Sequence, residues 1–194
     1  MQLDKKEADE ETDVDTTSVE AAFVLLMRWL HRQPEFTPEM LKDEEVQQFI
    51  RTHAEVLDDA VDFSIRQRPL DDISVQRLKE SNYVFSGFKT FHELNEAFPS
   101  QLDKDGNRKP FERFLNDVQK INENYNKWYL KAEYNFAMSS ADMAARWQGW
   151  WDDEDRDRYL LQYRTVGDKR VRKVHRALHN VTLPITSRFW DEYF

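Results

Sequence analysis

The sequence of 194 residues contains no cysteine. This excludes disulfide bonds, cysteine nucleophiles and zinc sites built on cysteine ligands. Glycine is scarce, at four residues, and there is no glycine-rich motif that could hold a phosphate, as in a P-loop or a dinucleotide-binding turn. The sequence therefore lacks the signals of the most common nucleotide-dependent and thiol-dependent enzymes, and we expect no cofactor.

Long hydrophobic runs are missing as well. The longest extends from Ala21 to Met27, far short of the roughly 20 residues that a membrane-spanning helix needs. The N-terminus is acidic, whereas a signal peptide has a basic start and an apolar middle. We therefore expect a soluble protein that has no membrane partner and is not exported by the general pathway.

Charge is plentiful but unevenly distributed. The formal net charge is -9, yet residues 156–188 carry nine bases against two acids. A basic segment of this kind indicates a face for nucleic acid or for an acidic partner, unless acidic helices packed nearby balance it. Residues 1–20 carry eight acids against two lysines. Because residues 1–16 offer little apolar surface to bury, we predict that they form a disordered acidic tail.

Hydrophobic periodicity predicts a helical body. Thr17 and Glu20 have the spacing of a capping box, and Thr37-Pro38 is a start signal for a second helix. The stripe of this second helix consists of Val46, Phe49, Ile50, His53, Leu57 and Val61. A third helix is predicted from about Ile73 to Pro99. Its expected inward positions are Val75, Leu78, Phe85, Phe88, Phe91 and Leu94. We interpret His53 and His92 as core histidines.

The longest helical pattern begins at Pro110 and meets no glycine or proline before Gly149. It predicts one helix of about 40 residues, or two helices with a break at Ser139-Ser140, paired with another helix. The expected inward positions are Phe111, Phe114, Val118, Ile121, Tyr125, Trp128, Ala132, Phe136, Met143 and Trp147. Aromatic residues in this region are interpreted as core, or as a buried protein interface. They are Trp128, Tyr129, Trp147, Trp150 and Trp151.

A compact basic and aromatic segment, Tyr159 to Phe194, follows. Its pattern predicts a strand, a Gly-Asp turn, a short Arg/His helix and a second strand closed by Pro184. The predicted fold is mainly α, with long antiparallel helices followed by a small α+β strand–turn–helix–strand unit. The predicted parts are the tail (1–16), N-terminal helices (17–69), a helical body with a long helix pair (70–151) and the basic α+β unit (152–194).

Two histidines in the basic segment raise the question of a metal site. His175 and His179 are four residues apart and could face one metal ion, but two ligands do not make a site. We expect instead that His175 packs beside Tyr163 and that His179 caps the end of the helix.

Asp168 and His175 raise the question of catalysis, because an acid beside a histidine can act as a general acid–base pair in nuclease-like chemistry. No nucleophile, phosphate loop or second acid lies nearby. The favoured role of Asp168 is therefore structural, with Arg170 or Arg172 as its partner. We expect an interaction surface and no catalytic or metal site. The candidate binding residues are Arg164, Asp168, Arg170, Arg172, His175 and Trp190.

An ordered series of motifs in residues 70–194 resembles the phage Mu F-like family of minor head, or head morphogenesis, proteins. The series consists of Phe85–Leu94, Phe111 and Phe114, Tyr125–Tyr134, Met143–Trp147, Leu161–Asp168, Arg170–Arg172, His175, Leu183-Pro184 and Phe189-Trp190. Two positions depart from the family pattern. Lys173 stands where a proline is usual, and Asn180 replaces a glycine, which is acceptable if its backbone is left-handed.

The resemblance implies a virion protein of a tailed phage or prophage, present in the host cytoplasm during assembly. Such proteins act in head morphogenesis, with the portal or other head proteins as partners and, in some cases, packaged DNA. They are not established as enzymes. Two alternatives stay open on the residues alone: a nucleic-acid-binding module that uses the basic segment, and a metal-dependent nuclease-like enzyme.

Overall fold

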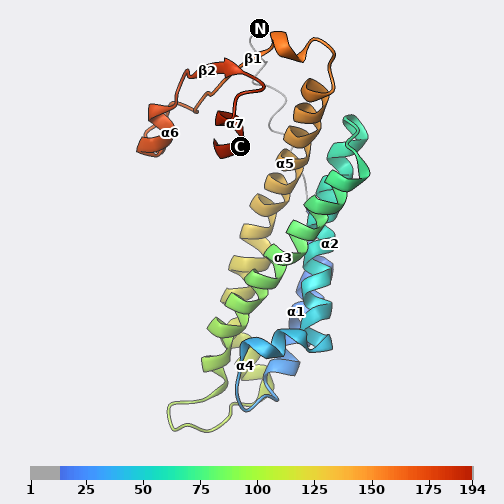
Figure 1. Cartoon of the computed structure of the whole chain (residues 1–194). Coiled ribbons are helices and arrows are strands. Elements are labelled where there is room, and N and C mark those ends of the chain that lie inside the picture. Colours follow the sequence, from blue (N-terminus) through green and yellow to red (C-terminus); the bar gives the residue numbers. More distant parts are fainter. Residues whose placement is uncertain (1–13, 194) are drawn as a thin grey trace. The chain divides into compact units, whose positions relative to one another are not determined.

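The computed structural model describes residues 14–193 and is mainly α-helical, with a two-stranded antiparallel sheet near the C-terminus (Figure 1). The predicted fold class is therefore confirmed. Contacts divide the chain into two compact units that meet within helix α5. We call residues 14–143 the helical unit and residues 144–193 the C-terminal unit. Of the predicted acidic tail, residues 1–13 lie outside the described part of the chain.

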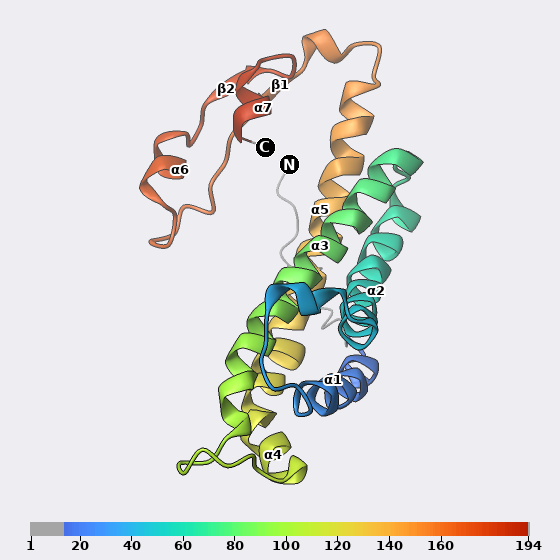
Figure 2. The same cartoon turned by 60° about the horizontal axis from the view of Figure 1, so that its bottom comes forward.

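The helical unit is built from antiparallel helices around one core. Its elements are α1 (Thr17–Leu30), η1 (Pro38–Lys42), α2 (Glu44–Gln67), α3 (Asp72–Ala97), η2 (Phe98–Gln101), α4 (Phe111–Asn122), the π-helix η3 (Glu123–Tyr129) and α5 (Leu130–Trp151). Helices α2 and α3 form a hairpin, and α5 runs beside α3 (Figures 1 and 2). No helix within residues 14–193 is long and apolar enough to cross a membrane.

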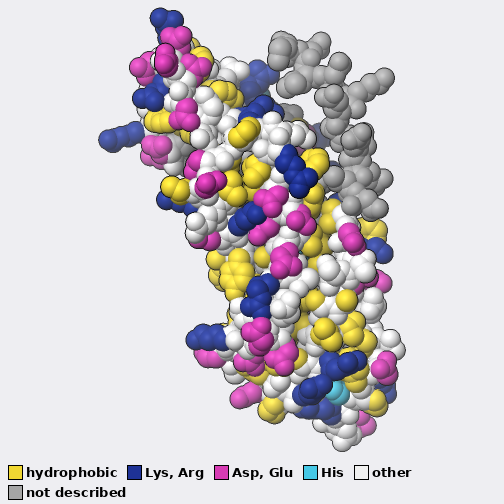
Figure 3. Space-filling model, turned by 90° about the vertical axis from the view of Figure 1, so that its right-hand side faces the viewer, with side chains coloured by type: hydrophobic (Ala, Val, Ile, Leu, Met, Phe, Trp, Pro, Cys, Tyr) yellow, Lys and Arg dark blue, Asp and Glu magenta, His cyan; other side chains and the backbone are white. Residues whose placement is uncertain are grey.

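The core of the helical unit draws on all five of its α-helices. Its largest fully buried apolar side chains are Phe23, Leu26, Met27, Leu30, Phe49, Leu57, Leu94, Phe114 and Leu130. The predicted stripe of α2, from Val46 to Val61, is buried as expected. On the face drawn in Figure 3, acidic and basic side chains lie close together, with hydrophobic atoms between them. This is the pattern of helices with wide solvated faces.

The first two α-helices do not start where the sequence predicts. Thr16 precedes the first residue of α1, and its hydroxyl bonds the Glu20 carboxylate over 3.0 Å. The Thr37-Pro38 signal begins the 3-10 helix η1 and not α2. The sequence Asp-Lys-Asp-Gly-Asn at 103–107 predicts a turn, and the structure confirms it, with a φ of 80° at Gly106. That conformation is accessible to glycine at little steric cost.

The helical path from α4 to α5 is continuous, as the first of the two predicted alternatives has it, and the alternative break at Ser139-Ser140 is absent. The interruption lies earlier, at η3. A π-helix has a wider turn than an α-helix, so the residues after it face another direction than a 3.6-residue repeat predicts. The buried positions along this path are Phe114, Val118, Ile121, Asn122, Asn126, Leu130, Ala137 and Ala141.

Several predicted inward positions are therefore wrong. The side chains of Trp128, Ala132, Phe136 and Met143 are exposed, because the π-helix turns them away from the core. Tyr129 and Trp151 are exposed too, so the interpretation of these aromatic residues as core fails. On α3, three residues that were predicted to be buried are exposed, namely Phe85, Phe88 and His92. The inward face of α3 instead carries the polar residues Ser86, Lys89, Thr90 and Glu93 together with Leu94 and Ala97.

The C-terminal unit has the predicted strand–turn–helix–strand order. After the end of α5, its elements are η4 (Arg156–Arg158), β1 (Leu160–Gln162), α6 (Lys173–Ala177), β2 (Thr182–Pro184) and α7 (Phe189–Tyr193). Strands β1 and β2 are antiparallel, and Leu161 lies opposite Leu183. Asn180 has a φ of 70°. This confirms the left-handed backbone that allows asparagine to replace glycine.

Candidate functional site

The structure places the predicted binding residues of the C-terminal unit on its surface, with one exception. Six cations lie between the two strands in sequence, and all six side chains are exposed. They are Arg164, Lys169, Arg170, Arg172, Lys173 and Arg176. Arg164 bonds the Gln162 side chain and Arg176 bonds a backbone carbonyl, but among residues 14–193 none of the six pairs with a carboxylate. This segment therefore keeps its positive charge available to a partner.

Asp168 fixes the turn through the backbone. Its Oδ1 accepts a hydrogen bond from the backbone N–H of Arg170 over 2.9 Å. The predicted contact with an arginine side chain is replaced by this local bond, which aspartate forms readily in turns. The carboxylate is exposed, so it shapes the loop without neutralising the surrounding cations.

The two histidines of this unit bind different groups. His175 packs beside Tyr163 as predicted, with Tyr163 Oη 2.6 Å from His175 Nδ1 and the rings stacked at 24°. His179 does not cap the helix end. Its Nδ1 accepts a hydrogen bond from the backbone N–H of Thr165 over 3.1 Å and lies 2.8 Å from the Thr165 hydroxyl. His179 thereby ties α6 to the chain that leaves β1.

Trp190 is the exception among the predicted binding residues. Its side chain is 2% exposed, and its Nε1–H donates to the carbonyl of Pro184 over 2.8 Å. Phe189 meets its ring edge-on at 4.9 Å. The indole of Trp190 is therefore not presented on the surface, because it is buried in the C-terminal unit, as is Ile185.

The helical unit holds a buried polar cluster that the sequence analysis missed. Lys89, on α3, has 6% exposure, and its Nζ donates to three acceptors. These are Nε2 of His53 at 2.7 Å, the backbone carbonyl of Tyr125 at 2.6 Å and Oε2 of Glu133 at 2.7 Å. Tyr125 belongs to η3, so the ammonium holds α2, the π-helix and α5 together at one point.

The hydrogen bonds around His53 define its tautomer. The Ser86 hydroxyl donates to the carbonyl of Asn82 over 2.8 Å, so its oxygen serves as an acceptor for His53 Nδ1 at 2.8 Å. His53 Nδ1 then carries the proton, and Nε2 is left to accept from Lys89. Burial lowers the pKa of His53 below its ordinary value, in accord with a neutral ring.

Charge in the cluster resides on Lys89 and Glu133. Burial alone would raise the pKa of Glu133, but the charge and hydrogen bond of Lys89 oppose it, and this pKa lies below its usual value. Burial lowers the pKa of Lys89, and the negative charges of Glu133 and Glu93 oppose that shift. We therefore describe the pair as an ammonium and a carboxylate that share a partly desolvated site.

Glu93 lies one helical turn after Lys89 and is fully buried. Burial raises its pKa to about 8, so this carboxyl is largely protonated at neutral pH. Its Oε2 accepts from Nδ2 of Asn126 at 3.1 Å, while its Oε1 and Oδ1 of Asn126 have no partner among the described residues. Two buried polar atoms are thus left unsatisfied beside the π-helix, which is a costly arrangement.

A pocket of about 350 Å³ opens beside this cluster. Its lining comes from α2, α3, η3 and α5, and consists of Leu57, Ser81, Asn82, Phe85, Tyr129, Ala132, Glu133, Phe136 and Ala137. The walls are mostly apolar, and Glu133 is the only residue of this lining with an ionisable carboxylate. We call this cavity the aromatic pocket, because Phe85, Tyr129 and Phe136 form its exposed rim.

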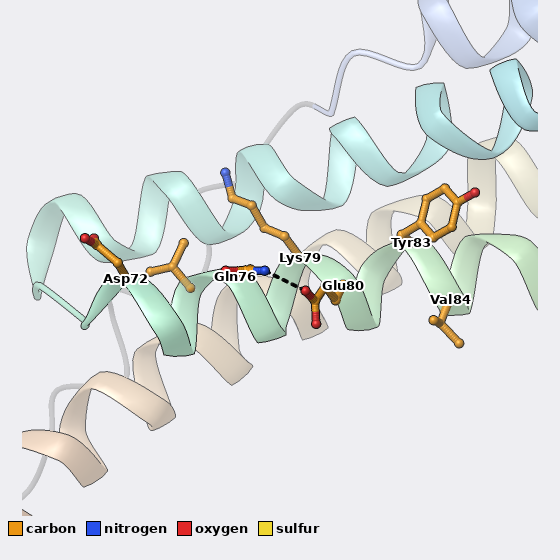
Figure 4. Close-up of a pocket in the computed structure, with 7 residues that line it drawn as sticks. Asp72, Gln76, Lys79, Glu80, Tyr83 and Val84 are labelled. Carbon is orange, nitrogen blue, oxygen red and sulfur yellow. Dashed lines mark hydrogen bonds between the residues drawn. The ribbon is translucent and has the colours of Figure 1, made fainter.

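A second hollow lies along one side of α3, and its lining residues all come from that helix (Figure 4). Its polar groups bond within the protein. Gln76 donates to Glu80 over 2.8 Å, and Lys79 pairs with Asp62 on α2 at 2.8 Å. The hollow is an open surface groove along a single helix, and it offers no convergent polar groups to a ligand.

Two signals in the sequence point toward the missed cluster. His53 on an apolar stripe requires buried polar partners, and Lys89 and Glu93 are four residues apart on one helix face. The periodicity of α3 hid them, because its phenylalanines were assigned to the inward face. Within residues 14–193, no group of three or more potential metal ligands converges.

The groups weighed above for catalysis are bonded elsewhere. Asp168 and His175, the alternative acid–base pair, each bind another group, and no hydrogen bond joins them among the described residues. Lys89 has all three of its donors engaged, and it is absent from the pocket lining.

No family model, no curated protein and no solved structure matches the chain.

Proposed function

We propose that the chain is a minor head protein of a tailed phage or prophage, of the Mu F-like kind, and that it acts in head morphogenesis by binding the portal or other head proteins. Its place would be the virion, and the host cytoplasm during assembly. The proposal rests on the series of motifs in residues 70–194 and on the exposed cationic segment of the C-terminal unit.

The cationic segment is the observation that supports a binding role. Six exposed cations lie within 13 residues, from Arg164 to Arg176, with Asp168 as the only acid among them. The bonds of Asp168, His175 and His179 hold this segment in a defined shape. A fixed cluster of cations complements an acidic surface on a partner and gives specificity and fast association.

The same segment favours a second candidate, binding to the phosphate backbone of packaged DNA. Unpaired arginine and lysine side chains neutralise phosphates without reading the base sequence. The two candidates differ in how binding depends on salt. Phosphate binding falls steeply as salt rises, whereas a protein interface with an apolar centre keeps most of its affinity.

The test starts from the gene. Portal and terminase genes are expected beside it, and the portal protein of that cluster is the partner to purify. Binding of the whole chain to this portal and to double-stranded DNA is measured at about 0.05 M and 0.2 M salt. The variant Arg170→Glu/Arg172→Glu reverses charge in the cationic segment. The variant Lys104→Glu/Lys127→Glu makes the same change of net charge at exposed positions of the helical unit.

We expect the Arg170→Glu/Arg172→Glu variant to bind the portal at least about tenfold more weakly, and the control variant to change affinity by less than about twofold. Equal loss in both variants would mean that net charge alone drives binding. No binding to any head protein from that cluster, or no phage genes beside this one, would overturn the proposal. Salt-sensitive binding to DNA alone would select the second candidate.

A further inference from the structure

We propose that the aromatic pocket of the helical unit binds an organic cation, namely an ammonium or guanidinium group on an apolar stem. The pocket lies in a different unit from the cationic segment, so this inference does not depend on the proposed head function. Its chemistry follows from three features of the pocket: an aromatic rim, one ionised carboxylate and a volume that suits a small ligand.

The Glu133 carboxylate bonds to other described residues through only one of its two oxygens. Glu133 turns Oε2 toward Lys89, at 2.7 Å, and toward His53, at 3.3 Å. Its other oxygen, Oε1, makes no hydrogen bond among the described residues, and the side chain, 17% exposed, lines the pocket. An ionised oxygen with a free lone pair in an apolar wall accepts strongly from a charged N–H donor.

The rim supplies the second half of a cation site. Phe85, Tyr129 and Phe136 line the pocket and expose between 45% and 74% of their side chains. The face of an aromatic ring attracts a cation placed over it, and the ring also covers the apolar stem of an alkylammonium or alkylguanidinium. These residues are otherwise hard to explain, since large exposed aromatics on neighbouring helices usually mark a binding surface.

The π-helix is what brings the rim and the carboxylate to one place. It turns Tyr129 and Phe136 out of the core, and it leaves the Tyr125 carbonyl to bond Lys89. Lys89 in turn fixes Glu133. Irregular helical turns of this kind are frequent at functional sites. The volume of about 350 Å³ lies at the lower end of small-ligand pockets, and matches a short stem with one charged head.

Charged and titratable groups on α2 and α3 also lie near the pocket. On α3, Lys89 carries the positive charge that pairs with Glu133, and Glu93 is largely protonated. On α2, His53 is neutral, and Asp58 accepts a hydrogen bond from Asn82 of the pocket lining over 2.9 Å. A cation in the pocket would therefore bind Glu133 Oε1. Lys89 is bonded to the other carboxylate oxygen, Oε2, and all three donors of its ammonium group are engaged.

The experiment uses the whole chain and n-butylguanidinium as the probe, with n-butylurea as its neutral counterpart of the same shape. Binding is followed by the NMR shifts of side-chain methyl and aromatic resonances. We expect saturable shifts at Leu57 and Phe136 with butylguanidinium, and at least about tenfold weaker binding of butylurea. Equal binding of both compounds would show a merely hydrophobic pocket and would overturn the proposal.

Three variants locate the site. Glu133→Gln should weaken butylguanidinium binding at least about fivefold and leave butylurea unchanged. Phe136→Ala removes an exposed wall without touching the core and should weaken binding about threefold. Phe88→Ala, an equally exposed aromatic on α3 outside the pocket lining, is the control and should bind as the parent. If Phe136→Ala binds normally, the pocket is not the site, whatever Glu133→Gln does to the fold.

A last comparison identifies the source of the cation. N-acetyl-arginine amide carries the guanidinium on a peptide backbone, and N-acetyl-citrulline amide is its neutral counterpart. Tighter binding of the arginine compound than of butylguanidinium would assign the pocket to a side chain of a partner protein. Exclusion of the arginine compound, with butylguanidinium still bound, would assign it to a free small molecule. Failure of every cationic probe would refute the inference and leave the proposed head function untouched.

Discussion

Lys89 Nζ and Glu133 Oε2 lie 2.7 Å apart and join α3 to α5 inside the helical unit. Removal of the lysine ammonium leaves the buried Glu133 carboxylate without its partner, and it also removes the hydrogen bond from Lys89 to the Tyr125 carbonyl. We expect Lys89→Met to lower the free energy of unfolding by about 3–5 kcal/mol. The exposed pair Arg51–Glu44 is the control, and Arg51→Met should cost less than about 1 kcal/mol. Chemical denaturation measures both, and similar small losses would contradict the buried role of Lys89.

The buried carboxyl of Glu93 predicts a dependence of stability on pH. Its pKa is raised from the ordinary 4.5 to about 8, so between these values the folded protein holds a proton that the unfolded chain releases. The contribution of Glu93 to stability therefore falls as pH rises from about 4.5 to about 8, and is constant above that.

The variant Glu93→Gln isolates this effect, because glutamine stays neutral and keeps the oxygen that faces Asn126. His53, whose lowered pKa gives the opposite slope below its ordinary value of 6.5, is present in both proteins and largely cancels. Relative to the parent, Glu93→Gln should gain about 2 kcal/mol or more of stability between pH 5 and pH 8. A difference that does not vary with pH would mean that Glu93 is ionised throughout.

The π-helix determines which side chains of α5 pack in the core. Leu130 is fully buried, whereas Phe136 is exposed although the regular repeat assigned it inward. Leu130→Ala should cost about 2–5 kcal/mol in the free energy of unfolding. Phe136→Ala should cost less than about 1 kcal/mol. The reverse order would show that α4 and α5 continue as one regular α-helix.

Asn180 reports on the turn of the C-terminal unit. Its φ of 70° suits glycine, so Asn180→Gly should leave the melting temperature unchanged or slightly raised. Asn180→Ala should cost about 1 kcal/mol, because a Cβ without a local hydrogen bond disfavours this backbone. The two variants are compared by thermal unfolding, followed through the NMR signal of the indole N–H of Trp190, which is buried in this unit. Equal stability of the two variants would argue against the left-handed conformation.

The features of the fold that depend on local sequence pattern were predicted from the sequence. The stripe from Val46 to Val61, the turn at Gly106 and the order of the C-terminal elements all follow from periodicity and turn chemistry, and the structure has them. The seven-residue π-helix was not predictable from periodicity, because its preference over an α-helix rests on tertiary bonds. One of these is the bond from Lys89 to the Tyr125 carbonyl.

The aromatic pocket was missed for the same reason. A repeat of 3.6 residues, carried past η3, places Trp128 and Phe136 in the core. On α3, Phe85 and Phe88 were assigned inward because they are large and apolar, although the helix buries Lys89 and Glu93. Hydrophobicity outweighs charge in a pattern search, whereas the folded chain buries charge where several polar partners converge. The positions of the cations from Arg164 to Arg176, by contrast, could be read directly.

The proposed head function is tested most directly in assembled particles. Phage heads are induced from the cells that encode the chain, purified away from soluble protein and analysed by quantitative mass spectrometry. We predict that the chain is present in the heads in far fewer copies than the major capsid protein. We also predict that it is lost from them when Arg170→Glu/Arg172→Glu replaces the parent and retained in the Lys104→Glu/Lys127→Glu control. Infectious heads that form normally and contain none of the parent chain would contradict this account.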